Sequence, residues 1–312
     1  MSFRLSIIMP VYNGAERLPR MLDGLAAQTC RDFELIAVND GSTDASAEVL
    51  RAYGDRVNLR LIDQANGGAS SAYNRGLGEA TGELVFMLDQ DDLLHPQAVE
   101  FILRGMAESP ADTLIFDYRD VDERQAAEVK ADFAVVAECP PVRPLTGNVL
   151  RWFLDENRNP GIWQFCFRRE AIAGLRFVEG ITLEDNLFVF PLLAKEGLRF
   201  AHLPVALYAY LQQPASVMHT SKLSWRLESF GKIFGGLHDV LTTENYRYLM
   251  TRHFVPELKS MWRVATFSGK RSFAKFMRRM FKDGLACPSD FPPRWLIRFW
   301  LYGDLARLKF VG

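Results

Sequence analysis

The sequence predicts an α/β fold in which helices flank a mainly parallel sheet, followed by a helical C-terminal region. Over the first 120 residues, short apolar runs alternate with helical patterns, and polar residues follow directly after several of these runs. Strands that alternate with helices of roughly 10–15 residues form βαβ units and parallel sheets. From about residue 225 onward, helical patterns dominate and strand patterns disappear.

The expected elements follow from the spacing of apolar residues. Leu18, Leu22 and Leu25 recur at helical spacing after Pro19, which suits the first position of a helix. A loop-rich stretch is expected at 121–148, where prolines and charges are scattered. The expected strands are 5–9, 33–38, 57–62, 84–88, 162–167 and 199–210, and further helices are expected at 44–53, 70–79 and 184–194.

Charge is unevenly distributed along the chain, although its net value is only −1. Residues 221–312 carry 17 Lys and Arg against seven Asp and Glu, so the rest of the chain is acidic. This asymmetry predicts a domain over 1–220 and a basic helical region over 221–312. The alternative is that the basic residues merely solvate helix faces.

Composition excludes several classes of protein. The four cysteines, Cys30, Cys139, Cys166 and Cys287, are too far apart for a zinc site or a disulfide framework, so buried reduced thiols are expected. No run of about 18 apolar residues occurs, and the N-terminus lacks the order of a signal peptide. We therefore expect a cytoplasmic protein.

Three carboxylates follow the strand at 84–88 within four residues. Asp89, Asp91 and Asp92 would repel one another without a partner, and a divalent cation stabilises such a cluster. Mn²⁺ and Mg²⁺ suit carboxylate and phosphate oxygens, and Mg²⁺ usually binds through one or two carboxylates plus substrate phosphate. The alternative for Asp92 is that it caps a helix beginning near Pro96.

Polar residues also follow the strand at 33–38. Gly41 permits a tight turn, and the carboxylate of Asp40 can accept a hydrogen bond from a nucleobase N–H. Strand-to-helix turn chemistry without a ligand is the alternative. Ligands bind at the carboxyl ends of the strands in such sheets, which favours a nucleotide site here.

Five motifs, in this order and spacing, together resemble a family-2 glycosyltransferase with the GT-A fold. The match covers residues 4–120, and the pair Glu184-Asp185 extends it to about 210. The motifs are Met9-Pro10-Val11-Tyr12-Asn13, Asn39-Asp40-Gly41-Ser42-Thr43-Asp44, Asn66-Gly67-Gly68, Asn74-Arg75-Gly76 and Leu88-Asp89-Gln90-Asp91-Asp92.

The resemblance implies roles for residues of these motifs. Asp40 would contact the base, typically uracil, while Pro10 and Tyr12 would line the nucleotide pocket. Asp89 would hold the ribose or the sugar, and Asp91 would be the main ligand of Mn²⁺ or Mg²⁺. The other donor-binding residues implied are Asn13, Gly68, Asn74, Arg75 and Gln90.

The reaction implied is an inverting transfer of a sugar from a nucleotide-diphosphate donor, a UDP-sugar, to an acceptor hydroxyl. Asp185 would be the general base and Glu184 would position donor or acceptor. One departure concerns Tyr73, since many members have Ala-Arg-Asn at this point; the nucleotide contact of that arginine is in doubt here, and the neighbouring Arg75 is the candidate to replace it. His219 is a candidate third metal ligand or phosphate contact, or else a surface or packed residue.

The basic C-terminal region interleaves aromatic residues with cations, as in Phe273, Phe276, Arg278, Trp295 and Arg298. This pattern is typical of peripheral contact with an anionic membrane. The family resemblance implies a glycan or lipid-linked glycan acceptor of cell-envelope or polysaccharide synthesis, which such contact would reach. A helical cap with a buried stripe is the alternative. Two other functions were weighed: nucleic-acid binding through this region, for which no motif is present, and nucleotide-sugar binding without turnover.

Overall fold

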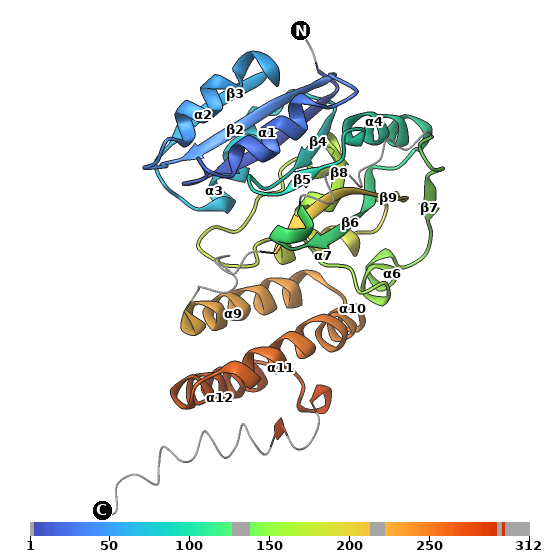
Figure 1. Cartoon of the computed structure of the whole chain (residues 1–312). Coiled ribbons are helices and arrows are strands. Elements are labelled where there is room, and N and C mark those ends of the chain that lie inside the picture. The colour runs from blue at the N-terminus through green and yellow to red at the C-terminus, as the bar shows by residue number, and fades with distance from the viewer. Residues whose placement is uncertain (1–2, 127–137, 213–221, 292–294, 297–312) are drawn as a thin grey trace, which may run out of the picture. The chain divides into compact units, whose positions relative to one another are not determined.

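The computed structural model describes residues 3–126, 138–212, 222–291 and 295–296, and Figure 1 shows their arrangement. Within these residues nine strands form one sheet, in the order β3-β2-β1-β4-β8-β6-β9-β5, with β7 also paired to β9. The strands are β1 (Leu5–Val11), β2 (Phe33–Asp40), β3 (Leu59–Gln64), β4 (Leu84–Met87), β5 (Leu93–Leu94), β6 (Thr113–Val121), β7 (Arg143–Leu145), β8 (Phe165–Arg168) and β9 (Phe200–Leu211).

Two compact units divide the described residues. The first comprises residues 3–126, 138–147, 161–180 and 195–212 and holds the whole sheet; the second comprises 148–160, 181–194, 222–291 and 295–296. The chain therefore passes between the units more than once. The predicted boundary after residue 220 stays a prediction.

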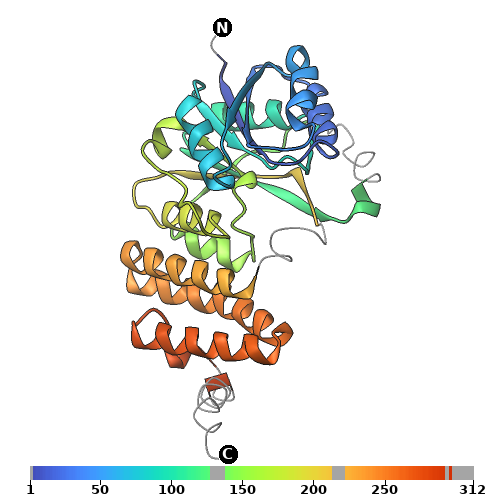
Figure 2. The same cartoon turned by 90° about the vertical axis from the view of Figure 1, so that its left-hand side faces the viewer.

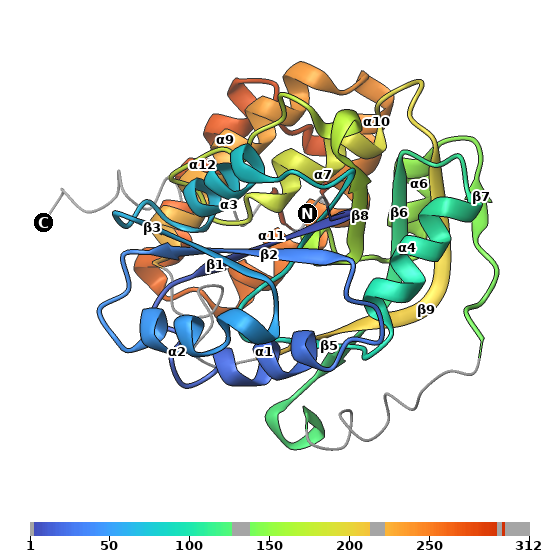
Figure 3. The same ribbon diagram turned by 90° about the horizontal axis from the view of Figure 1, so that it is seen from above.

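The half of the sheet built from β1 to β4 is parallel, as predicted. β1, β2 and β3 are each followed by a helix, and α1 and α2 cover one face of this half while α3 covers the other (Figure 3). Leu18, Leu22 and Leu25 are all fully buried in the core beneath the sheet. The helices of this unit are α1 (Leu18–Ala26), α2 (Ser46–Ala52), α3 (Ala69–Glu79) and α4 (Ala98–Glu108), with short 3₁₀ turns η1 (Gly54–Arg56), η2 (Ile162–Gln164) and η3 (Arg169–Ile172).

The other half of the sheet is mixed. β8 lies between β4 and β6 and runs antiparallel to both, whereas β6 and β9 pair in parallel. The remaining reversed strands are the short β5 and β7, so most strands share one direction and end at one edge. The expected strand at 162–167 begins as the 3₁₀ turn η2, and β8 starts only at Phe165.

Helices form the second unit, in agreement with the predicted helical C-terminal region. Figure 2 shows its helices within residues 223–282 in orange and red, stacked side by side. Aromatic side chains of three helices, Phe190, Phe230, Phe234 and Phe254, meet in its core. The elements are α6 (Val149–Asp155), α7 (Asp185–Leu193), α9 (Leu223–Val240), α10 (Thr243–Leu249), the π-helical turn η4 (Met250–Phe254), α11 (Val255–Val264), α12 (Phe267–Lys282) and the 3₁₀ turn η5 (Pro288–Asp290).

All four cysteines are free thiols, with Cys139 and Cys166 buried and Cys30 and Cys287 half-buried. Burial raises the pKa of Cys139 and, more strongly, that of Cys166.

Candidate active site

The loops after β1 and β2 are joined by hydrogen bonds at the carboxyl edge of the sheet. The backbone N–H of Asn13 donates to Ser42 Oγ at 3.0 Å, and Asn13 Oδ1 accepts from the backbone N–H of Thr43 at 2.8 Å. Ala15 N donates to Asp44 Oδ2 at 3.0 Å. Asn13 takes a positive φ of 45°, which asparagine tolerates better than most residues. The two strand-end motifs therefore form one interlocked surface.

Gln90 ties the loop after β4 to the same surface. Its amide group donates to Tyr12 O at 3.0 Å and accepts from Tyr12 N at 3.2 Å, as a neighbouring strand would. Gly14 leaves room for this amide, because a Cβ there would lie 2.2 Å from Gln90 Oε1. Pro10, the next-to-last residue of β1, is half-buried, while Tyr12 is 48% exposed.

Asp40 is only 2% exposed and holds the glycine loop that precedes α3. Its Oδ1 accepts from Gly67 N at 2.8 Å and from Gln64 Nε2 at 2.7 Å, and its Oδ2 accepts from Gly68 N at 2.8 Å. Gly68 has a φ of 84°, which glycine adopts without strain. A carboxylate has about four acceptor sites. One remains for the predicted base contact, which stays a prediction.

Of the three acidic residues after β4, Asp92 does not point into this surface. It is 1% exposed, and its carboxylate accepts from Tyr208 Oη at 2.6 Å and from Leu211 N at 2.7 Å, both on β9. Burial, with the charges of Asp89 and Asp91, holds the pKa of Asp92 well above its usual range. The alternative that Asp92 caps a helix is wrong, because α4 begins at Ala98 after Gln97.

Asp89 and Asp91 are the carboxylates that fit a divalent cation. Asp91 lies 3.7 Å from the guanidinium of Arg17, and about a quarter of its side chain is exposed. In the described part of the chain, no three His, Cys, Asp or Glu side chains could hold a metal ion. Two carboxylates nonetheless suit Mg²⁺ or Mn²⁺, which take further oxygen ligands from a bound diphosphate.

The remaining predicted donor-binding residues lie on α3. Asn74 exchanges hydrogen bonds with the backbone of Phe177, at 3.0 and 2.8 Å, and its amide also reaches Glu179 at 3.2 Å. Arg75 pairs with Glu79 at 3.1 Å on the exposed side of the same helix. Tyr73, where the arginine of other members is missing, is buried and donates to Asp89. The structure thus gives Tyr73 a contact that the sequence pattern did not reveal.

The second unit contains the predicted catalytic pair, Glu184 and Asp185, where α7 begins. The preceding Leu183 has a φ of 61°, an unusual value for a branched side chain and one that often marks a functional site. Burial raises the pKa of Glu184. Asn186 Nδ2 donates to Leu183 O at 2.9 Å, and Asn186 Oδ1 lies 3.2 Å from His253 Nε2.

His219 lies outside the described residues, as do Arg298 and the rest of the C-terminal stripe after residue 296. Phe273 and Trp295 are buried and pack against Trp262. This packing is what the helical-cap alternative predicts for these two side chains. None of the helices within the described ranges is both long and apolar enough to cross a membrane.

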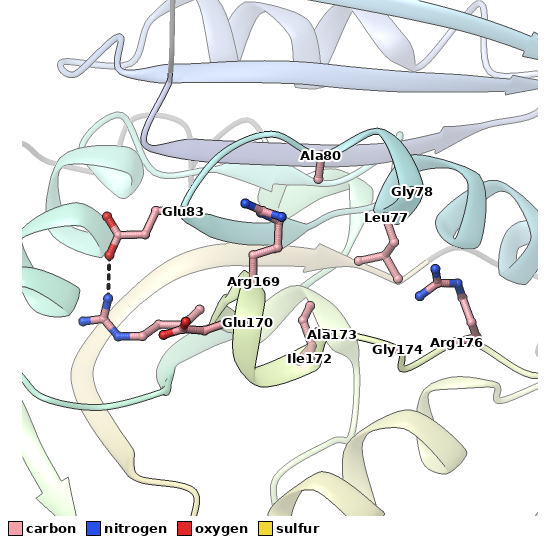
Figure 4. A pocket seen from close by; sticks show the side chains of 11 residues that line it. Leu77, Gly78, Ala80, Glu83, Arg169, Glu170, Ile172, Ala173, Gly174 and Arg176 are labelled. Carbon is pink, nitrogen blue, oxygen red and sulfur yellow. Dashed lines mark hydrogen bonds and ion pairs between the residues drawn. The ribbon is translucent and has the colours of Figure 1, made fainter.

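A cavity of about 670 Å³ lies at the opposite edge of the sheet (Figure 4). It is lined by the end of α3 and by η3, and Arg168 on its wall pairs with Glu83 at 2.6 Å. These residues stand at the amino end of β4, whereas Asp89 follows its carboxyl end. The cavity is therefore separate from the predicted site.

Comparison with known proteins identifies the family. The sequence matches the family model of glycosyl transferase family 2 over residues 6–173, more than half of the chain. The chain belongs to this family. It is a glycosyltransferase, as the motifs predicted.

The chain is 30% identical over 230 residues to the uncharacterized glycosyltransferase YibD of Escherichia coli (strain K12). That match covers 69% of this chain but only 63% of YibD.

Solved structures show the same GT-A fold. Staphylococcus aureus TarS 1–349, in complex with UDP-GlcNAc, matches 88% of this chain and 79% of its own, with a TM-score of 0.68 and 18% identity. The mannosyltransferase PcManGT of Pyrobaculum calidifontis, in complex with GDP-Man and Mn²⁺, matches 100% of this chain and 89% of its own, with a TM-score of 0.53 and 17% identity.

Proposed function

We propose that this glycosyltransferase uses Mn²⁺ or Mg²⁺ and moves a sugar from a UDP-sugar to an acceptor hydroxyl, with inversion at the anomeric carbon. One observation carries the proposal: the loops after β1, β2 and β4 are interlocked, and they bring Asp40 and the Asp89–Asp91 pair to a single edge of the sheet. Two similar folds were solved with nucleotide sugars, one of them with Mn²⁺.

In this proposal Asp40 receives the base and Asp89 the ribose or sugar, while Pro10 and Tyr12 flank the nucleotide. Asp91 holds the cation, which supplies positive charge against the leaving diphosphate. Asp91 and Asp89 therefore act on the donor end of the reaction.

The acceptor end is assigned to the pair at the start of α7. Asp185 accepts the proton of the acceptor hydroxyl, whose oxygen forms a bond to the anomeric carbon. The bond from that carbon to the diphosphate oxygen breaks, and its electron pair leaves with the nucleotide. Attack from the face opposite the leaving group inverts the configuration. Glu184 is proposed to position the acceptor or donor.

The acceptor is proposed to be a glycan or lipid-linked glycan of cell-envelope or polysaccharide synthesis. Family resemblance supports this assignment. Membrane contact through the basic C-terminal region stays a prediction, and it would have to use side chains other than the buried Phe273 and Trp295.

Two variants separate the proposed roles. Asp91→Ala should weaken metal-dependent binding of UDP, measured by calorimetry. Asp185→Asn should abolish nucleotide release in the presence of acceptor while leaving UDP affinity nearly intact. Asp55→Asn, an exposed carboxylate in η1, is the control and should change neither quantity. Equal loss of UDP affinity in the Asp91 and Asp185 variants would count against the assignment. Intact binding with no transfer in the wild-type protein would favour a binding protein without turnover.

A further inference from the structure

Two buried tyrosines from distant parts of the chain hold Asp89, Tyr73 at its carboxylate and Tyr208 at its backbone N–H. We infer that Tyr73 and Tyr208 are positioning residues of the donor site, which act through Asp89 and set the geometry in which it meets the nucleotide sugar. This inference rests on the proposed function, since it assumes that Asp89 contacts the donor.

Tyr73 fixes the side chain of Asp89. Its hydroxyl donates to Asp89 Oδ1 at 2.8 Å and lies 3.4 Å from Leu88 O. The ring, 2% exposed, stacks on Phe177 with centroids 4.9 Å apart and planes 24° apart. Phe177 is in turn held at its backbone by two hydrogen bonds with Asn74, whose Nδ2 donates to Phe177 O and whose Oδ1 accepts from Phe177 N. The phenol is therefore restrained on its ring face as well as at its hydroxyl.

Tyr208 fixes the backbone of Asp89. Its hydroxyl accepts from Asp89 N at 3.1 Å and donates to Asp92 Oδ2 at 2.6 Å. The ring is fully buried and stacks almost parallel on Trp163, with centroids 4.9 Å apart and planes 6° apart. The other oxygen of Asp92 accepts from Leu211 N at 2.7 Å. The turn after β4 is thus fastened to β9.

These contacts do more than fill the core. A buried tyrosine hydroxyl needs one partner, but Tyr208 bridges two groups of the same turn. Tyr73 gives the carboxylate of Asp89 a hydrogen bond from a neutral donor. Held at both its amide and its carboxylate, Asp89 loses little conformational freedom when a donor binds. Preorganisation of this kind increases affinity.

The test uses Tyr73→Phe and Tyr208→Phe, with Tyr210→Phe as the matched control. Tyr210 also stacks on Trp163, with centroids 5.4 Å apart, and its hydroxyl has no hydrogen-bond partner in the described ranges. Calorimetry measures the dissociation constant of UDP with Mn²⁺ well below the unfolding temperature. We expect each of the two variants to raise this dissociation constant about tenfold. The control should change it by less than twofold.

A double-mutant cycle shows whether the effect passes through Asp89. In an Asp89→Ala background, Tyr73→Phe should change UDP affinity by less than twofold, because the group that it positions is gone. If Tyr208→Phe fails to fold, Tyr73→Phe and this double-mutant cycle still test the inference. UDP affinities equal to that of the Tyr210 variant, or additive effects in the cycle, would overturn the inference while the proposed function stands. A wild-type protein that binds neither UDP nor GDP with Mn²⁺ would overturn both.

Discussion

Replacement of Asp40 by asparagine tests the role of this carboxylate in holding the loop at Gly67 and Gly68, separately from its predicted contact with the base. The amide that results keeps the shape of the side chain but offers only one acceptor oxygen. It can retain the bonds from Gly67 and Gln64, now without charge assistance, and it loses the bond from Gly68.

The magnitude follows from these three bonds. A hydrogen bond to a charged group contributes roughly 1.5–3 kcal/mol and a neutral one roughly 0.5–1.5 kcal/mol. Two bonds weakened by about 1 kcal/mol each, and one lost that contributed about 2 kcal/mol, give a total of about 4 kcal/mol. That energy corresponds to a roughly thousandfold change in an opening equilibrium.

Amide hydrogen exchange of the protein without ligand measures this directly. In Asp40→Asn the N–H groups of Gly67 and Gly68 should exchange roughly a thousandfold faster than in the wild-type protein. Asp63→Asn is the control, because Asp63 lies on the neighbouring strand and its side chain is 57% exposed. Unchanged exchange at Gly67 and Gly68 in the Asp40 variant would refute the structural role.

Two further predictions concern stability. Burial raises the pKa of Glu257 to about 7, against the opposing effect of Arg226, so its ionisation should lower the stability of the second unit as pH rises from 4.5 to 7. Burial lowers the pKa of His253 to about 4, so stability should instead rise between pH 4 and 6.5. At 1.36 kcal/mol per pKa unit each effect is about 3 kcal/mol, and the two oppose each other in the wild-type protein. In urea titrations at several pH values, the stability of Glu257→Gln should only rise with pH, because the His253 effect remains. The stability of His253→Gln should only fall with pH, because the Glu257 effect remains. Stability independent of pH in both variants would contradict the burial argument. On α3, Gly76→Ala should lower the free energy of unfolding by about 1–3 kcal/mol, because the added Cβ would lie 2.3 Å from a methyl group of β1. Gly78→Ala, with open space around it, should raise the free energy of unfolding by up to about 1 kcal/mol. Equal unfolding midpoints for these two variants would be the contrary result.

The parallel half of the sheet could be predicted because each of its strands is indicated by a short stretch of neighbouring residues. Each of the strands β1 to β4 is a short apolar run, and each is followed by a helix or a polar turn, so spacing alone indicates βαβ units. The third strand starts at Leu59 and not at the predicted residue 57, because Asn58 has a φ of 48°, which is outside the range of a strand.

The mixed half could not be predicted in the same way. β8 is inserted between β4 and β6, a pairing between residues about 80 positions apart in the case of Leu84 and Arg168. No periodicity in a short window records which strand lies beside which. β6 was not among the strands predicted from the sequence.

In the candidate site, too, the features indicated by local sequence could be predicted and the contacts between distant residues could not. The acidic and asparagine residues at strand ends were visible as motifs, and the structure brings those after β1, β2 and β4 to one edge of the sheet. The contacts of Asp92 with Tyr208 and Leu211 were not visible, because they depend on the register of β9, more than a hundred residues later. One signal was available: Tyr208, in a mostly apolar strand, has a hydroxyl that must find a partner once buried.

The central claim is that the sheet edge at Asp40, Asp89 and Asp91 binds a nucleotide diphosphate together with a divalent cation. Thermal unfolding with UDP, GDP or dTDP, each with Mn²⁺ and with a chelator, tests it most directly. A nucleotide present at 100 times its dissociation constant should stabilise the folded protein by about 2.7 kcal/mol. We predict this stabilisation for UDP with Mn²⁺ and its loss with chelator. No stabilisation by any of the three nucleotides, or stabilisation that persists with chelator, would contradict the claim.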